Sequence, residues 1–140
     1  MAYLIDTGFW YATIDRNDKH HAKVVQASEK LHETTVVPLP AITETAYLVG
    51  RNLGVEHLAK FSENLSRTTF QIESPNAQDY NRIAEILRKY NDNNIDFVDA
   101  CIVAMAERLN ITKILTVDHR HFRTFKPAHC DSFELIPEKL

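Results

Sequence analysis

The sequence has few of the residues and runs that identify common binding motifs. Its three glycines, Gly8, Gly50 and Gly54, are too few and too scattered for a Walker A loop or a GxGxxG dinucleotide motif. Its two cysteines, Cys101 and Cys130, show neither CxxC nor Cys/His spacing, which argues against a zinc site. No Gly-x-Ser-x-Gly turn is present either. These absences exclude the common phosphate-binding loops and the serine-hydrolase turn.

Long apolar runs and a disulfide framework are also missing. The longest apolar runs are a handful of residues, so no membrane span is expected. The first residues, Met-Ala-Tyr-Leu-Ile-Asp, lack the basic start of a signal peptide, and two cysteines suggest a reducing compartment. We therefore expect a cytoplasmic protein. The net charge of −3 argues against a protein that coats nucleic acid by charge alone, but it leaves room for a local basic rim that grips RNA.

The residues that are present fit a globular α/β protein. The chain has 140 residues, 44% hydrophobic and 25% charged, so we expect one domain spanning residues 1–140. Short apolar runs predict strands, and apolar residues at three- and four-residue steps predict helices. The expected strands are 2–5, 34–38, 68–72, 113–117 and 133–136, and the expected helices are 19–32, 41–51, 55–65, 78–90 and 96–109, with a short aromatic helix from residue 9.

The alternation of strands and helices predicts a three-layer α/β/α sandwich with a central parallel sheet. In the helix expected at 19–32, the periodic apolar positions that should face the core are Ala22, Val25 and Leu31. Residues 119–122 are expected to form a loop or a short helix.

Asp99 is the least expected residue of the helix that begins near Asp96. It shares one helical face with Ile102, Val103, Ala106 and Leu109, and no lysine or arginine lies three or four residues away. A carboxylate on a core-facing stripe is costly unless something positive satisfies it. Asp96 and Asp99 also fit a helix-capping box, and the N-cap role explains Asp96 fully. A capping acid does not need to lie on the apolar face, so Asp99 remains a candidate site residue.

Three further acids lie where an α/β fold usually places its active site. Asp6 and Asp118 each follow a predicted strand, at the carboxyl edge of the sheet. Glu44 lies in the first half of a helix, again with no basic residue at helical spacing. Taken singly, each acid has an ordinary alternative: a turn or N-cap residue for Asp6 and Asp118, and an exposed glutamate at a helix start for Glu44.

In the predicted fold, Asp6, Glu44, Asp99 and Asp118 open onto the same edge of the sheet. Carboxylates that lie this close cannot all ionise without a counterion. A ligand set made only of oxygen suits Mg²⁺ or Mn²⁺ better than zinc. Such an ion would lower the pKa of a water molecule and neutralise charge on a scissile phosphate. The acids therefore point to metal-assisted attack on a phosphodiester.

At these residues the sequence resembles the PIN domain family, and its length is similar to that of VapC-type toxin ribonucleases. The matching segments are Leu4-Ile5-Asp6-Thr7, Thr43-Glu44, Asp96-Phe97-Val98-Asp99-Ala100 and Thr116-Val117-Asp118 with Phe122 four residues later, and they span nearly the whole chain. The resemblance places the family's acidic quartet on Asp6, Glu44, Asp99 and Asp118, with Asp96 as an accessory acid. It also places orienting hydroxyls on Thr7 and Thr116.

The resemblance implies a PIN-like fold and an endoribonuclease that depends on Mg²⁺ or Mn²⁺. The four acids of the quartet would be both catalytic residues and metal ligands. Asp6 and Asp99 are the first candidates for direct ligands and Asp118 is the next, and Glu44 would bind the ion directly or through water. The family also implies a homodimer and inhibition by a protein antitoxin. Arg51, Arg120 and Lys126 are candidate phosphate contacts, although surface salt bridges are the commoner role for such residues.

Two other functions fit parts of the pattern. A phospho-receiver module also places acids around Mg²⁺, but it needs a phospho-acceptor Asp after the third strand, where this chain has Glu73-Ser74-Pro75. A PIN-like domain that binds RNA without cutting it would share the fold. The complete set of four acids argues against that second alternative, and a cleavage assay is needed to exclude it.

Overall fold

A five-stranded parallel sheet forms the centre of the molecule. The computed structural model describes residues 1–140. The strands lie in the spatial order β3-β2-β1-β4-β5 and all four neighbouring pairs are parallel. Their bounds are β1 (Ala2–Ile5), β2 (Thr34–Pro38), β3 (Gln71–Glu73), β4 (Lys113–Leu115) and β5 (Glu134–Ile136). Leu4 pairs with Val36 on one side and Ile114 on the other, so the first strand of the chain is the central one.

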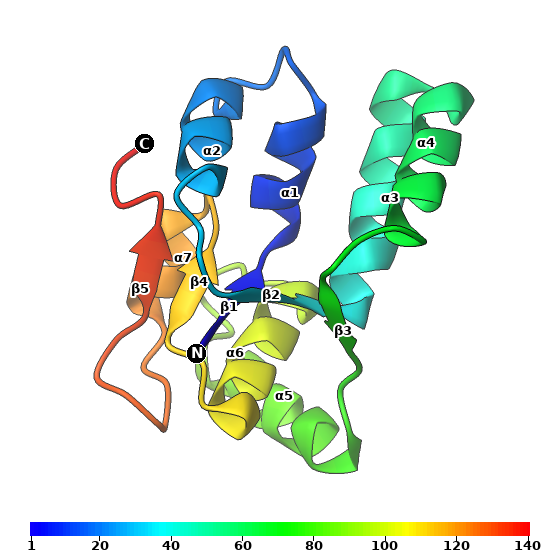
Figure 1. Cartoon of the computed structure of the whole chain (residues 1–140). Coiled ribbons are helices and arrows are strands. Elements are labelled where there is room, and N and C mark those ends of the chain that lie inside the picture. The colour runs from blue at the N-terminus through cyan, green and yellow to red at the C-terminus, as the bar shows by residue number, and fades with distance from the viewer.

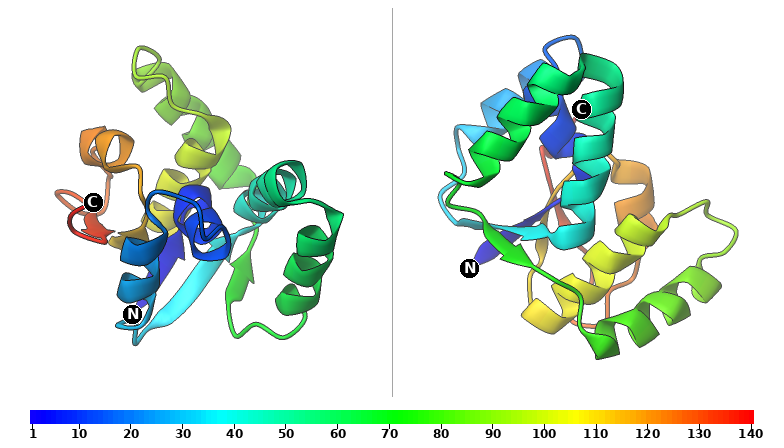
Figure 2. Two further views of the ribbon diagram at one scale, coloured as in Figure 1. Left: turned by 90° about the horizontal axis from the view of Figure 1, so that it is seen from above. Right: turned by 90° about the vertical axis from the view of Figure 1, so that its right-hand side faces the viewer.

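Helices cover both faces of this sheet, as Figures 1 and 2 show. One face carries α1 (Thr7–Ile14), α2 (His21–Ser28), α3 (Leu39–Leu53) and α4 (Val55–Leu65), and the other carries α5 (Ala77–Lys89), α6 (Phe97–Leu109) and α7 (His119–Thr124). The predicted three-layer α/β/α sandwich is confirmed. None of these helices combines the length and the hydropathy that crossing a membrane requires.

The two faces of the sheet bury two separate apolar clusters. Successive strand residues point to opposite faces, so Leu4 and Ile114 pack with α5 and α6, whereas Ile5 and Leu115 pack with α1 to α4. Phe122 attaches α7 to the first of these clusters. The centre of the sheet is therefore buried on both sides, which explains why β1 is a continuous apolar run rather than an alternating one, whereas the edge strand β3 is largely exposed.

Several predicted elements differ in detail from the observed ones. β3 begins at Gln71 rather than at residue 68, and β4 ends at Leu115 rather than at residue 117. α2 is also shorter than predicted, and it buries Val24 while Ala22 is exposed. The ring of His21, the first residue of α2, lies 2.7 Å from the carbonyl oxygen of Ala12. This contact fixes how the short helix docks on α1, and its apolar spacing alone does not reveal that orientation.

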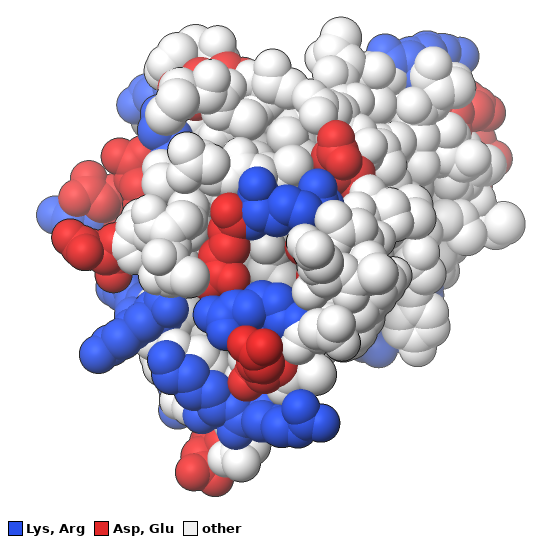
Figure 3. Space-filling view, turned by 90° about the horizontal axis from the view of Figure 1, so that it is seen from below, with Lys and Arg blue, Asp and Glu red and all other residues white.

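α6 is the central helix of its face. The sequence predicts one apolar stripe, but every residue from Val98 to Ala106 is buried. α5 packs along it, and two ion pairs join the helices: Arg82 Nε to Glu107 Oε1 at 2.7 Å, and Arg108 Nε to Asp79 Oδ2 at 2.8 Å. Figure 3 shows basic and acidic side chains next to one another on this face. These ion pairs hold the C-terminal end of α6 against α5.

Candidate active site

The predicted acids line one cleft at the carboxyl edge of the sheet. The cleft has a volume of about 260 Å³ and is lined by Asp6, Thr7, Gly8, Glu44, Leu48, Asn94, Asp96, Asp99, Val117, Asp118 and His121. All four acids of the predicted quartet and the accessory Asp96 are therefore brought together. No lysine or arginine lines the cleft, which agrees with the absence of basic partners at helical spacing.

Asp6 occupies the junction between β1 and α1. Its backbone N–H donates to the Leu115 carbonyl at 2.9 Å, which continues the pairing of β1 with β4. Its Oδ1 accepts a hydrogen bond from the Thr7 N–H at 2.8 Å, and its Oδ2 accepts one from the Thr116 hydroxyl at 2.9 Å. Both carboxylate oxygens are thus oriented by neighbours. Gly8 lets α1 approach β4 closely, because a Cβ there would lie 2.9 Å from Val117 Cγ2.

Asp118 is fixed by the turn between β4 and α7. Its N–H donates to the Thr116 hydroxyl at 2.9 Å, so Thr116 connects Asp118 to Asp6. Asp118 also caps α7 by accepting from the His121 N–H at 3.2 Å. The resemblance predicts that the hydroxyls of Thr7 and Thr116 orient carboxylates. The Thr116 hydroxyl does so, by donating to Asp6. The Thr7 hydroxyl is instead buried without a hydrogen-bond partner.

Asp96 and Asp99 form the capping box that their spacing predicts. Asp96 Oδ1 accepts from the Asp99 N–H at 2.9 Å, and Asp99 Oδ2 accepts from the Asp96 N–H at 3.1 Å. Asp99 is buried, whereas Asp96 is exposed. The capping and functional explanations are therefore compatible for Asp99: one oxygen caps the helix while the residue still lines the cleft.

Burial makes the acids of the cleft difficult to ionise. It raises the pKa of Asp6 to about 7, against the hydrogen bonds from Thr116 and Thr7, and the nearby charges of Asp118 and Glu44 raise it further. Burial is also the main reason that the pKa of Asp99 is raised, followed by the charges of Asp96 and Asp6. Without a cation, like charges that lie this close favour the protonated forms.

Glu44 comes from α3, on the other side of the cleft from β4. Burial raises its pKa, the neighbouring Thr7 side chain lowers it, and the charge of Asp96 raises it. Glu44 therefore lies close to the start of α1 and to the start of α6, although α1, α2 and β2 separate it from Asp6 along the chain. This is the convergence that its position in the first half of a helix predicted.

His121 belongs to the cleft although the sequence analysis does not include it in the acidic site. Its Nδ1 lies 2.7 Å from Asp118 Oδ2 and 3.7 Å from Asp99 Oδ2. An ionised carboxylate only accepts hydrogen bonds, so a hydrogen bond from His121 to such a carboxylate requires the tautomer with its proton on Nδ1. The available signal was the three-residue step from Asp118 to His121, which places both side chains on one side of a helix start.

The basic residues that were singled out lie elsewhere. Arg51, Arg120 and Lys126 are exposed and do not line the cleft. None of them forms a salt bridge, so the expected surface ion pairs are absent. Arg51 instead lies over the ring of Tyr47, with its Cζ 5.9 Å from the ring centroid.

The donor set of the cleft fits a divalent cation that prefers oxygen. Ligand atoms of Asp99, Asp118 and His121 lie within 4.8 Å of one another, and the oriented carboxylate of Asp6 opens onto the same space. The buried hydroxyl of Thr7 adds a polar atom that lies near the Glu44 carboxylate and has no hydrogen-bond partner of good geometry. Carboxylates and hydroxyls match Mg²⁺ or Mn²⁺, and a single histidine does not make a zinc site.

Comparison with known proteins agrees with this geometry. Residues 3–126 match the model of the PIN domain family. The chain is 30% identical to Ribonuclease VapC26 of Mycobacterium tuberculosis over 134 residues, which is 96% of this chain and 99% of that protein.

Solved structures show the same fold. The crystal structure of Mycobacterium tuberculosis VapC20, described as a Sarcin-Ricin loop cleaving toxin, superposes with a TM-score of 0.75 at 20% identity, covering 80% of this chain and 86% of that one. VapBC2 from Rickettsia felis, bound to a DNA fragment from its promoter, gives a TM-score of 0.68 at 17% identity, covering 96% and 97%. The fold, the acidic cleft and the match over most of the sequence agree, and the chain belongs to the PIN domain family.

Proposed function

We propose that this chain is an endoribonuclease that hydrolyses RNA phosphodiester bonds with the aid of Mg²⁺ or Mn²⁺, and that it is the toxin of a toxin–antitoxin pair. The observation that carries the proposal is the convergence of five acids in one cleft without a lysine or arginine. The similarity to Ribonuclease VapC26 supports RNA as the substrate.

Each acid has a separate role in this proposal. Asp6, Asp99 and Asp118 would hold the ion directly, Glu44 would hold it directly or through water, and Asp96 would be an accessory acid that also caps α6. A divalent ion in such a site lowers the pKa of water and neutralises charge on the phosphate. The hydroxyl of Thr116 keeps Asp6 and Asp118 at a fixed separation, and the capping box keeps Asp99 at the end of its helix. Because these carboxylates are already oriented, they need no reorganisation during the reaction.

The decisive experiment measures cleavage of structured RNAs by the purified chain. Cleavage is expected with Mn²⁺ or Mg²⁺ and is expected to stop with a chelator. The Asp99→Asn variant is the matched control, because the side chain keeps its size while losing its charge. Binding of RNA without cleavage under every metal condition would instead support the non-catalytic RNA-binding alternative.

The ends of the products separate this mechanism from a histidine-based one. Water that attacks from outside the sugar breaks the bond to the 3′-oxygen and leaves a 5′-phosphate and a 3′-hydroxyl. A histidine base that deprotonates the RNA 2′-hydroxyl leaves a 2′,3′-cyclic phosphate. We expect the first pair, and a substrate with one 2′-deoxy nucleotide at the cut should still be cleaved. If mass spectrometry instead finds 2′,3′-cyclic phosphate ends, the metal mechanism is wrong and His121 or His119 becomes the candidate general base.

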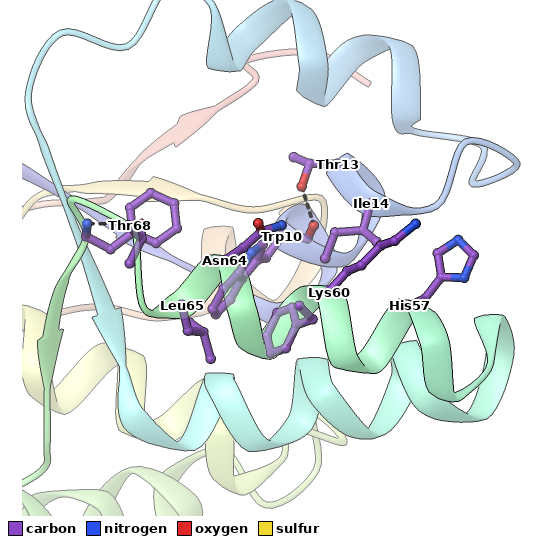
Figure 4. A pocket seen from close by; sticks show the side chains of 10 residues that line it. Trp10, Thr13, Ile14, His57, Lys60, Asn64, Leu65 and Thr68 are labelled. Carbon is purple, nitrogen blue, oxygen red and sulfur yellow. Dashed lines mark hydrogen bonds between the residues drawn. The ribbon is translucent and has the colours of Figure 1, made fainter.

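A protein antitoxin is the partner that the toxin role requires, and the structure offers an apolar groove for it. The groove lies between α1 and α4, has a volume of about 460 Å³ and is lined in part by Trp10, Phe61, Leu65 and Phe70. Figure 4 shows the side chains that line the groove, with Trp10 and Asn64 near its middle and His57 toward one end. Trp10 and Phe61 pack at 5.0 Å between ring centroids. The similar solved structures include FitAcB from Neisseria gonorrhoeae and FitAB bound to an IR36 DNA fragment.

The groove is tested by inhibition of the ribonuclease with its co-purified partner. Leu65→Glu should weaken inhibition, because a charge would be buried beneath an apolar partner segment. Ser62→Glu, on the exposed side of the same helix, is the matched control and should not. The homodimer expected from the family is measured separately by light scattering at several protein concentrations.

A further inference from the structure

Two large aromatic side chains are exposed beside the acidic cleft. Tyr47 is 63% exposed and Phe97 is 48% exposed. Tyr47 lies three residues after Glu44 on α3, and Phe97 directly follows Asp96 at the start of α6. Glu44 and Asp96 are close enough for the charge of Asp96 to raise the Glu44 pKa. The two aromatics are therefore attached to neighbouring acids of the same site.

Packing within the chain does not account for these two residues. The buried run of α6 begins at Val98, one residue after Phe97. Tyr47 makes an aromatic contact with Arg51, whose guanidinium lies 5.9 Å from the ring centroid, and Arg51 forms no salt bridge. On α3 the residues Glu44, Tyr47, Leu48 and Arg51 form one stripe at three- and four-residue steps, and two of them, Glu44 and Leu48, line the cleft.

The negative charge of the cleft favours uncharged contacts, such as base stacking, for binding RNA. Five acids repel the phosphate backbone of any substrate, and no lysine or arginine lines the cleft to oppose this repulsion. Stacking on the face of a nucleobase adds affinity without charge, and it is available only where bases are unpaired. An arginine held over a ring also presents its guanidinium in a fixed position for a phosphate.

We propose that Tyr47 and Phe97 stack on bases of an unpaired RNA segment that enters the cleft from the side of α3 and the start of α6, with Arg51 on its backbone. This inference rests on the proposed function, because it takes RNA as the substrate. It makes the two aromatics substrate-binding residues beside the acidic cleft.

Binding is measured in the Asp99→Asn background, so that no RNA is consumed. Fluorescence anisotropy compares a labelled single-stranded RNA with the same sequence in a duplex. We expect Tyr47→Leu and Phe97→Leu each to weaken binding of the single strand by about 5- to 150-fold, the range that loss of one stacked base entails. Tyr47→Trp should retain affinity, because it keeps an aromatic face. Tyr80→Leu is the matched control, since Tyr80 is 50% exposed on α5, a helix that contributes no residue to the cleft.

Other results would overturn the inference. These are equal losses with Tyr80→Leu, equal affinity for duplex and single strand, or a shift from dimer to monomer in Tyr47→Leu or Phe97→Leu by light scattering. The last result would make the aromatics a contact between copies of the chain. Failure of the two proposals is distinguishable: an active wild-type enzyme with unchanged KM in both leucine variants overturns only the stacking, whereas a wild-type chain that cleaves no RNA overturns the proposed function.

Discussion

At the scale of single residues, the Thr116 hydroxyl determines how two acids face each other. It donates its one proton to Asp6 and accepts from the Asp118 N–H, so both bonds together fix its orientation. Asp6 is in turn held by the N–H of Thr7. The cleft thus contains carboxylates that are held in place before any ligand arrives, although burial disfavours their ionised forms.

Asp99→Asn is expected to abolish RNA cleavage while leaving the fold intact. The apolar residues that follow Asp99 on α6 hold the helix, and Asn keeps the size of the side chain. Metal-free protein should unfold at a higher temperature in this variant, because a like charge is removed from the cleft. Circular dichroism and a cleavage assay check both parts. An unfolded variant would show that Asp99 is a structural residue instead.

The stability of the metal-free protein should fall as pH rises from about 4 to about 7. The pKa of Asp6 is about 7 in the folded chain and near 3.9 in an unfolded one. The folded state therefore binds more protons than the unfolded state between these values, and stability decreases with pH there. Burial lowers the pKa of His119, which acts in the opposite direction.

The urea midpoint of chelator-treated protein measures this dependence. Asp6→Asn should give a flatter pH profile than the wild type, and the difference between the two profiles isolates Asp6 from His119. Identical profiles would mean that Asp6 ionises normally in the fold.

At the scale of elements, the start of α6 serves both stability and the site. Asp96→Ala removes the N-cap and should cost about 1 kcal/mol of unfolding free energy. Asp96→Asn should cost much less, because Asn caps nearly as well as Asp. Chemical denaturation measures both variants. Cleavage by Asp96→Asn should be reduced less than by Asp99→Asn, and an equal loss would contradict the accessory role of Asp96.

The elements that the sequence predicts well are those that carry the acids. Asp6 and Asp118 follow short apolar runs whose burial on both faces leaves a continuous signal, and Asp96 and Asp99 show the spacing of a capping box. α2 was predicted less well: its eight residues contain two turns, and the contact of His21 with Ala12, not periodicity, decides that Val24 is buried. β3 is an edge strand that pairs only with β2, and only three of its residues take part in this pairing.

The site was predictable in its acids and not in its histidine. Glu44 and Asp99 have no basic residue at helical spacing, and Asp6 and Asp118 follow predicted strands, and both signals are visible along the chain. The contact between His121 and Asp118 depends on α7 beginning immediately after Asp118, and the sequence left a loop or a helix open there. The exposure of Tyr47 and Phe97 was not predicted, because the exposed fraction of a side chain depends on how the whole molecule packs.

At the scale of the whole molecule, we expect one cooperative unfolding transition that metal shifts upward. The two apolar clusters lie on opposite faces of one sheet and share its strands, so neither should unfold alone. A cation that binds only the folded state should add about 2.7 kcal/mol at a hundredfold excess over its Kd. Calorimetry with Mn²⁺, Mg²⁺ or chelator measures both. Two transitions would contradict a single domain over residues 1–140, and stabilisation by zinc alone would contradict the carboxylate site.

The strand order also has a consequence for the newly made chain. β1 is synthesised first but lies in the middle of the sheet, and one of its two partners, β4, follows more than a hundred residues later. Asp6 therefore has no Thr116 to orient it until most of the protein has left the ribosome. A chain that ends before β4 lacks both the complete sheet and the complete set of acids. We expect chains truncated before Lys113 to be degraded rapidly in limited proteolysis and to cut no RNA, so a protein that damages RNA would be harmless until its own translation is almost finished.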